Sequence, residues 1–154
     1  MTWSVRAATA FGVGFLPPFP GTWASTIPAA AAAGAFAAGA NEWAVRGGLA
    51  ALAVAFSAVT IAAGAACQAR FGATDPRAVV SDEVAGQSIA LLPACDPLSA
   101  LVAFALFRIF DVSKPWLIHA LELLPRGYGI LADDLGAGAA AGALVLAARL
   151  TGVL

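Results

Sequence analysis

The chain has 154 residues, of which 61% are hydrophobic and only 11% are charged, and its mean hydropathy is +0.88. This length predicts a single domain, residues 1–154, with a core of its own. The charged fraction is less than half that of an ordinary soluble domain, which indicates a membrane protein. A formal net charge of −1 with scattered Lys and Arg residues excludes a basic nucleic-acid-binding surface.

The first two uncharged stretches of the chain predict membrane helices at residues 22–40 and 49–66. Each is long enough to cross a hydrocarbon core of about 30 Å. The short link at residues 41–46 predicts that the two helices form a hairpin. Because both are rich in Ala and Gly, we expect them to pack closely on one another.

The next two uncharged runs, residues 84–95 and 97–107, are too short to cross a membrane separately. At 1.5 Å per residue each helix would cover less than about 20 Å. We favour a re-entrant helical hairpin, which returns the chain to the side where it entered. The alternative is one long kinked span over residues 84–110, which would separate the charged residues on its two flanks.

The last apolar run, residues 135–148, predicts a final membrane helix, with Arg149 reaching the membrane surface. Asp133 and Asp134 would lie at its N-terminal end, where simple helix capping would explain them. The expected fold is therefore all-α, a compact helical bundle with membrane-embedded helices and a re-entrant helical hairpin.

The basic residues predict the orientation of this bundle. Arg46 alone is expected in the turn on one side of the membrane. The other side would carry Arg6, Arg70, Arg77, Arg108, Lys114 and Arg126. Because cytoplasmic segments carry an excess of Lys and Arg, this second side is predicted to be cytoplasmic.

Seven of the seventeen charged residues form three short clusters. These are Asp82 with Glu83, then Arg108, Asp111 and Lys114, and finally Asp133 with Asp134. Buried carboxylates cost several kcal/mol unless they are paired or bind a metal. Five carboxylates close together therefore predict a divalent cation.

Mg²⁺ is the expected ion, because it prefers oxygen ligands and is commonly shared between carboxylates and phosphate oxygens. Arg108 and Lys114 are expected to hold the phosphate. The structural alternative is an ion-pair ladder, since Arg108, Asp111 and Lys114 recur every three residues on one face of a helix that Pro115 would end.

Several phosphatase chemistries are excluded by the sequence. The chain contains no C-x5-R motif for a cysteinyl-phosphate route and no D-x-D motif for an aspartyl-phosphate route. His119 is the only histidine, which excludes the two-histidine lipid phosphatases.

Four segments together resemble the phosphatidylglycerophosphatase A family. They are L-P-P-F-P-G-T at residues 16–22, V-S-D-E-V-A-G-Q at 80–87, F-R-I-F-D-V-S-K-P-W at 107–116 and G-Y-G-I-L-A-D-D at 127–134. The segments have the order and spacing of that family and cover roughly residues 11–142.

The resemblance implies an all-helical, Mg²⁺-dependent enzyme of the bacterial inner membrane, with its active site facing the cytoplasm. Its partners would be the membrane and a phospholipid substrate, phosphatidylglycerophosphate, which it would hydrolyse to phosphatidylglycerol and phosphate in phospholipid biosynthesis. The implied catalytic and metal-binding residues are Asp82, Glu83, Asp111, Asp133 and Asp134. The implied substrate-binding residues are Arg108, Lys114, Thr22 and Ser25.

Two functions of other classes remain open on the sequence. A small membrane transport or channel subunit would use the acidic cluster as an ion path, and a purely structural membrane protein would use every cluster as an ion pair. Phosphate release from a lipid phosphate, measured with and without Mg²⁺, distinguishes the enzyme from both alternatives.

Overall fold

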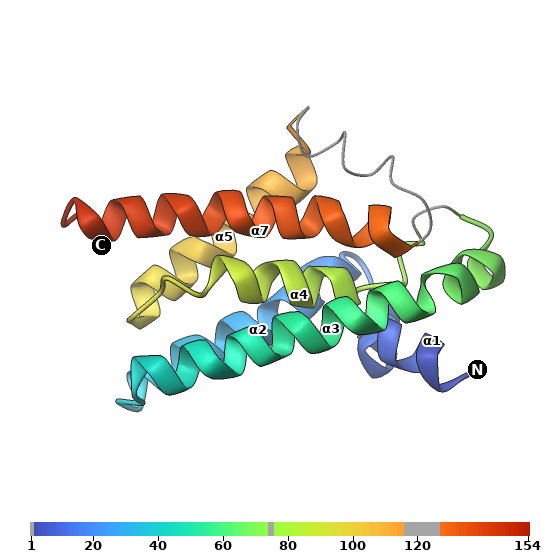
Figure 1. Ribbon diagram of the computed structural model, residues 1–154, viewed down its shortest axis with the longest axis horizontal. Helices are drawn as coiled ribbons and strands as arrows, with labels where there is room; N and C mark the ends of the chain where they lie inside the picture. Colours follow the sequence, from blue (N-terminus) through green and yellow to red (C-terminus); the bar gives the residue numbers. More distant parts are fainter. Residues whose placement is uncertain (1, 74–75, 116–126) are drawn as a thin grey trace.

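The computed structural model describes residues 2–73, 76–115 and 127–154, which form helices and no strand (Figure 1). This confirms the all-α prediction. The helices are α1 (Trp3–Ala8), the 3-10 helix η1 (Ala10–Phe15), α2 (Pro20–Ala37), α3 (Glu42–Phe71), α4 (Ser81–Ala90), α5 (Pro97–Ser113) and α7 (Gly127–Leu150).

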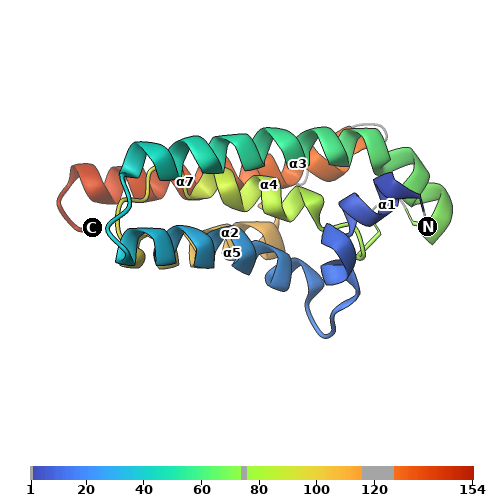
Figure 2. The same ribbon diagram turned by 90° about the horizontal axis from the view of Figure 1, so that it is seen from below.

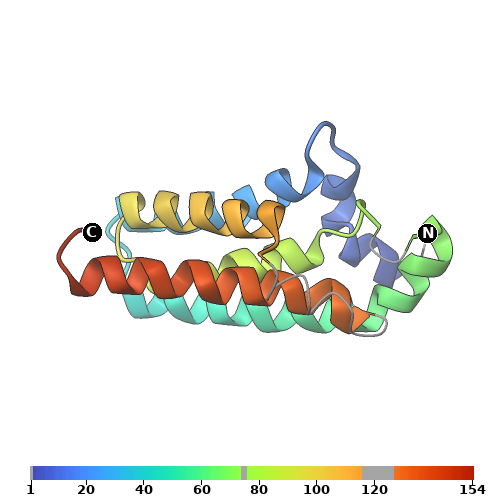
Figure 3. The same ribbon diagram turned by 90° about the horizontal axis from the view of Figure 1, so that it is seen from above.

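The short helix α4 forms the centre of the bundle. It contacts α2, α3, α5 and α7, which are all longer, and Figures 2 and 3 show it between them. Eight of its ten residues are buried. Because Asp82 and Glu83 lie in the first turn of this helix, the fold itself carries two carboxylates into its interior.

The expected close packing of the first two long helices is wrong. α2 packs mainly on α5 and α4, whereas α3 packs mainly on α4, α1 and α7. A side chain at Gly34 or Gly47 would meet nothing within 4 Å, so these glycines do not mediate a helix contact. The reason is that α4 lies between the two helices, which the composition of residues 22–66 could not indicate.

The predicted central hairpin is present as α4 and α5, which are connected by a turn at residues 91–96. The two helices run in opposite directions, so the end of α5 returns to the start of α4 (Figure 3). The alternative of one long kinked span over residues 84–110 is therefore wrong.

Asp96 fixes the start of α5 through a capping box. Its carboxylate accepts hydrogen bonds from the backbone N–H groups of Leu98 and Ser99 at 2.8 and 3.0 Å, and the Ser99 hydroxyl accepts one from the Asp96 N–H at 3.1 Å. These bonds, that from the Ser99 N–H above all, hold the pKa of Asp96 below its ordinary value of 3.8. The cap therefore contributes fully at neutral pH. It is lost in acid, as the pH falls below 3.8 and through the lowered pKa of Asp96.

We expect Asp96→Ala to lower the free energy of unfolding by about 1 kcal/mol, because two helix N–H groups lose their acceptor. Denaturant or thermal unfolding at neutral pH measures the change. Asp96→Asn is the matched control, because the amide oxygen can still cap the helix. Equal stability of the Ala variant and the wild type would contradict a capping role.

The last helix begins eight residues earlier than predicted, at Gly127 instead of residue 135. Asp133 and Asp134 therefore lie in its second turn, and the interpretation of the pair as N-terminal caps is wrong. The prediction placed the start of the helix just after this charged pair, whereas both side chains are buried inside the bundle at 4% exposure.

At the far end of α7, Arg149 lies near Arg46 and donates a hydrogen bond to the Pro93 carbonyl at 2.6 Å. Arg46 is therefore not alone on that side of the bundle, contrary to the prediction from the sequence.

Two of the described helices, α3 and α7, are long and apolar enough to cross a membrane. α2 is not among them, since the first half of its sequence contains Pro, Thr and Ser residues. The prediction of a membrane span at residues 22–40 stays a prediction.

Candidate active site

The three charged clusters meet in one pocket of about 300 Å³. The pocket lies where α2 and α4 begin, where α5 ends, and beside the second turn of α7. It is lined by Pro18, Phe19, Pro20, Gly21, Arg77, Val79, Asp82, Glu83, Arg108, Asp111, Lys114, Asp133 and Asp134. All five carboxylates and both cations singled out in the sequence are therefore in one place.

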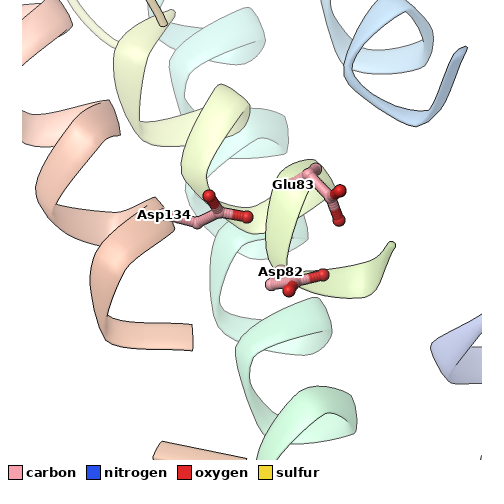
Figure 4. A group of neighbouring side chains, drawn as sticks. All are labelled: Asp82, Glu83 and Asp134. Carbon is pink, nitrogen blue, oxygen red and sulfur yellow. The ribbon is translucent and has the colours of Figure 1, made fainter. Parts of the chain in front are cut away.

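Asp82, Glu83 and Asp134 form the tightest group in the pocket. One carboxylate oxygen from each lies within 4.8 Å of the others, and Figure 4 shows the Asp134 side chain extending from α7 toward the turn of α4 that carries Asp82 and Glu83. This distance allows all three oxygens to bind the same ion.

Two glycines allow α4 and α7 to approach closely enough to form this group. A Cβ atom at Gly86 would lie 2.5 Å from the Asp134 carbonyl oxygen, and one at Gly138 would overlap the Gly86 carbonyl group. The two backbones are therefore in direct contact beside Asp134. Larger residues at either position would move Asp134 away from Asp82 and Glu83.

The two remaining carboxylates each pair with a cation. Arg108 donates to Asp111 within α5, and the Lys114 ammonium lies 2.7 Å from the Asp133 carboxylate of α7. The predicted ladder along one helix is therefore wrong at its last member. Lys114 ends α5 as a left-handed C-terminal cap (φ 39°), which turns the chain out of the helix, and its side chain reaches α7.

The pocket is negatively charged when all its groups are ionised, since five carboxylates and three cations leave a formal charge of −2. Burial raises the pKa of Glu83 to about 7. A hydrogen bond with Asp82 and the charge of Arg108 oppose this shift, and the charge of Asp111 adds to it. One buried oxygen of Glu83 accepts no hydrogen bond from the described residues. A divalent cation would satisfy that oxygen and cancel the excess charge, so the residues fit such an ion.

The segment 16–22 reaches the pocket through Pro18, Phe19, Pro20 and Gly21 and not through the hydroxyl of Thr22. Pro20 begins α2, and the Ser25 hydroxyl donates to the Gly21 carbonyl at 2.8 Å inside that helix. Neither Thr22 nor Ser25 lines the pocket, which differs from the expectation that both do. Gly21 instead gives Glu83 and Arg108 the space that a side chain would fill.

Arg77 also lines the pocket, although its sequence context did not predict a role in the site. It precedes the V-S-D-E segment by only three residues, which is the one indication the sequence offers. Gln87, one helical turn after Glu83, is completely buried, and its amide makes no hydrogen bond to the described residues. His119 lies outside the described residues.

Comparison with known proteins agrees with the four motifs. The family model described as phosphatidylglycerophosphatase A matches residues 6–149. A phosphatidylglycerophosphatase A of Haemophilus influenzae is 35% identical over 137 residues, which cover 83% of this chain and 77% of that protein. The chain belongs to the phosphatidylglycerophosphatase A family. The predicted family is confirmed, and with it the enzyme class, phosphatidylglycerophosphatase.

A second relative, from Bacteroides thetaiotaomicron, is named "Putative phosphatidylinositol-3-phosphatase" and is 40% identical over 79 residues. This match covers 49% of the chain and spans only half the length of that relative. No solved structure matches the chain. All three charged clusters lie within the residues matched by the phosphatidylglycerophosphatase A model.

Proposed function

We propose that the chain hydrolyses the terminal phosphomonoester of phosphatidylglycerophosphate in a Mg²⁺-dependent reaction, giving phosphatidylglycerol and inorganic phosphate for bacterial phospholipid biosynthesis. The observation that carries this proposal is the group of three carboxylates, the buried Asp82 and Asp134 and the half-buried Glu83, in a pocket that also holds Arg108 and Lys114. Carboxylates alone would suit a cation site. Carboxylates beside two cations suit a metal ion together with a phosphate.

In this proposal Asp82, Glu83 and Asp134 hold Mg²⁺, which supplies positive charge for the phosphate oxygens and acidifies bound water. The guanidinium of Arg108 and the ammonium of Lys114 donate hydrogen bonds to the phosphate. Asp111 and Asp133 keep these two cations in place through their ion pairs. Both cations remain oriented toward the pocket before substrate arrives, which lowers the cost of organising the transition state.

The reaction replaces one bond to phosphorus by another. The oxygen of a water molecule bonds to phosphorus as the P–O bond to the glycerol oxygen breaks. A proton of the water is accepted by a pocket carboxylate, and the glycerol oxygen leaves as a hydroxyl after taking up a proton.

We further propose that the protein spans the bacterial inner membrane with the pocket toward the cytoplasm. Only 28% of the most apolar window of α3 is buried, so most of this hydrophobic helix faces outward, as expected for contact with lipid. The end of the bundle that holds the pocket carries five described cations, and the other end carries Arg46 and Arg149. Arg77, Arg108 and Lys114 line the pocket, whereas Arg6 lies on α1 and Arg70 in the last turn of α3. This asymmetry supports a cytoplasmic pocket.

The names of the relatives support a choice of head group. The Haemophilus protein is named for phosphatidylglycerophosphate and covers most of this chain, whereas the match to the Bacteroides protein, named for phosphatidylinositol 3-phosphate, covers about half of it. We therefore propose phosphatidylglycerophosphate as the preferred substrate. Parallel assays with both lipids test this choice.

The purified protein in detergent micelles is expected to release phosphate from phosphatidylglycerophosphate when Mg²⁺ is present and to stop when excess EDTA is added. Activity should return when Mg²⁺ exceeds the chelator, and Ca²⁺ should substitute poorly because it accepts a looser and larger coordination shell. Free phosphate is the measured product. Undiminished release in excess EDTA would refute the metal requirement, and an ion flux without phosphate release would favour the channel alternative.

A further inference from the structure

A shallow apolar groove runs between α2 and α5 on the outer surface of the bundle. Its volume is about 210 Å³, and its lining is almost entirely hydrocarbon. The groove is lined by Thr26, Ala29, Ala30, Ala33, Ala100, Leu101 and Phe104. The single hydroxyl among them, that of Thr26, donates to the Thr22 carbonyl in its own helix at 2.8 Å, so the groove offers no free hydrogen-bonding group.

The groove exists because α2 presents alanines where it faces α5. The two helices contact one another, and α5 lies behind α2 in Figure 2. Ala30 is exposed and Ala33 is half-buried, so the small side chains leave a channel instead of a filled helix contact. Leu101 and Phe104 form the opposite wall.

The same two helices connect this groove to the pocket. On α5, Phe104 of the groove precedes Arg108 of the pocket by four residues, so the two side chains lie one helical turn apart on the same face of the helix. On α2, Trp23, Thr26, Ala30 and Ala33 follow one another along one face of the helix, which begins at Pro20 in the pocket. The Trp23 indole is held against the Pro17 carbonyl at 3.4 Å.

We propose that this groove binds one acyl chain of the lipid substrate while its phosphate occupies the acidic pocket. This proposal rests on the proposed function and identifies a binding site for the part of the substrate that does not react. A charged pocket and an almost entirely apolar groove, one helical turn apart on the same helix, match a molecule with a phosphate at one end and a hydrocarbon chain at the other. The small volume of the groove suits a section of one chain and not a helix of a second protein.

The groove makes the enzyme sensitive to chain length. Binding of an acyl chain removes hydrocarbon from water or detergent and holds the lipid in register with the pocket, so a longer chain is expected to lower KM. Wild-type kcat/KM should therefore be higher for dipalmitoyl than for dibutanoyl phosphatidylglycerophosphate. Equal values for the two lipids would overturn the proposal without any variant.

The decisive variant is Ala30→Phe, which fills the groove from an exposed position and leaves the core of the bundle untouched. We expect its KM for the dipalmitoyl lipid to rise by about tenfold or more, with kcat/KM for the dibutanoyl lipid within about twofold of the wild type. Ala31→Phe is the matched control. It places the same side chain on the next exposed residue of α2, which does not line the groove, and should behave as the wild type on both lipids.

Three results for Ala30→Phe would overturn the proposal that the groove binds an acyl chain. The first is wild-type kinetics on the dipalmitoyl lipid, and the second is an equal loss of activity on both lipids. The third is a changed oligomeric state in detergent, which would assign the groove to a second copy of the chain. Failure of the proposed function is a separate result. In that case the wild type releases phosphate from neither lipid, whatever the state of residue 30.

Discussion

We expect the Asp134→Asn protein to fold and assemble in membranes normally and to turn over phosphatidylglycerophosphate at least about a hundredfold more slowly than the wild type. The amide has nearly the shape of the carboxylate but removes one of three negative charges that lie within 4.8 Å of one another. If these charges hold the metal ion, the loss falls on an electrostatic element of the transition state. Phosphate release at saturating Mg²⁺ measures the effect.

Thermal unfolding provides a second readout that does not depend on activity. An ion that binds only the folded protein stabilises it by about 2.7 kcal/mol at a hundred times its dissociation constant. Mg²⁺ should therefore raise the Tm of the wild type and have little effect on that of Asp134→Asn. Without Mg²⁺ the variant should be at least as stable as the wild type, because the repulsion between buried carboxylates is reduced.

Glu42→Gln is the matched control for this loss of one negative charge. Glu42 pairs with Arg46 at the far end of the bundle at 2.7 Å, in a partly exposed pair worth at most about 1 kcal/mol. Its turnover and its response to Mg²⁺ should equal those of the wild type. If Asp134→Asn kept more than about half of the wild-type turnover and still gained Tm with Mg²⁺, Asp134 would not be a metal ligand.

Asp111 and Asp133 are poorer choices for this experiment because each is paired with a cation. Asp111→Asn would strand the guanidinium of Arg108 inside the pocket, and a loss of turnover could follow from misplacement of that cation. Asp134 forms no ion pair with the described residues, so its substitution leaves no cation without a partner.

The sequence predicted which residues meet, because the cost of burying charge is independent of the details of the fold. In an apolar chain, Asp82, Asp111 and Asp134 are acceptable only where they are compensated, and the structure places all three in one pocket. The hairpin of α4 and α5 followed from length alone, since neither run could cross a membrane.

The sequence could not predict how the charges pair or where the last helix begins. The alternative of an ion-pair ladder pairs Lys114 with Asp111 by their spacing along one helix, but the helix ends at Ser113 and Lys114 reaches Asp133 on another element. Such a pairing depends on the relative placement of α5 and α7, which the local pattern does not contain. The same holds for α2 and α3, since the position of α4 between them is a property of the whole bundle.

The glycines illustrate the same limit. Gly34 and Gly47 lie in long apolar helices, yet a side chain at either would meet open space. The glycines that do permit close contact are Gly86 and Gly138, on the two helices that carry the acidic group. Their role became visible only when α4 and α7 were placed together.

The second large effect is expected from Gly138→Ala. The new methyl group would overlap the Gly86 carbonyl, so α7 must move away from α4. Overpacking of this kind typically costs about 1–3 kcal/mol, which outweighs the gain of up to about 1 kcal/mol from replacing Gly by Ala in a helix. Because Asp134 lies one turn from the contact, it moves away from Asp82 and Glu83, and a displacement of about 1 Å can reduce turnover by about a hundredfold.

Gly142→Ala, one turn further along the same helix, is the control that separates this contact from a general effect of alanine. Its methyl group would lie 3.4 Å from the Ile89 carbonyl oxygen and 3.6 Å from the Ala90 Cα, which is ordinary van der Waals contact. We expect this variant to be as stable as the wild type or more stable by up to about 1 kcal/mol, with unchanged turnover. Thermal unfolding and phosphate release of the two variants, measured side by side, test the prediction. If Gly138→Ala matched Gly142→Ala in both measurements, the contact between α4 and α7 would not be what places Asp134 beside Asp82 and Glu83.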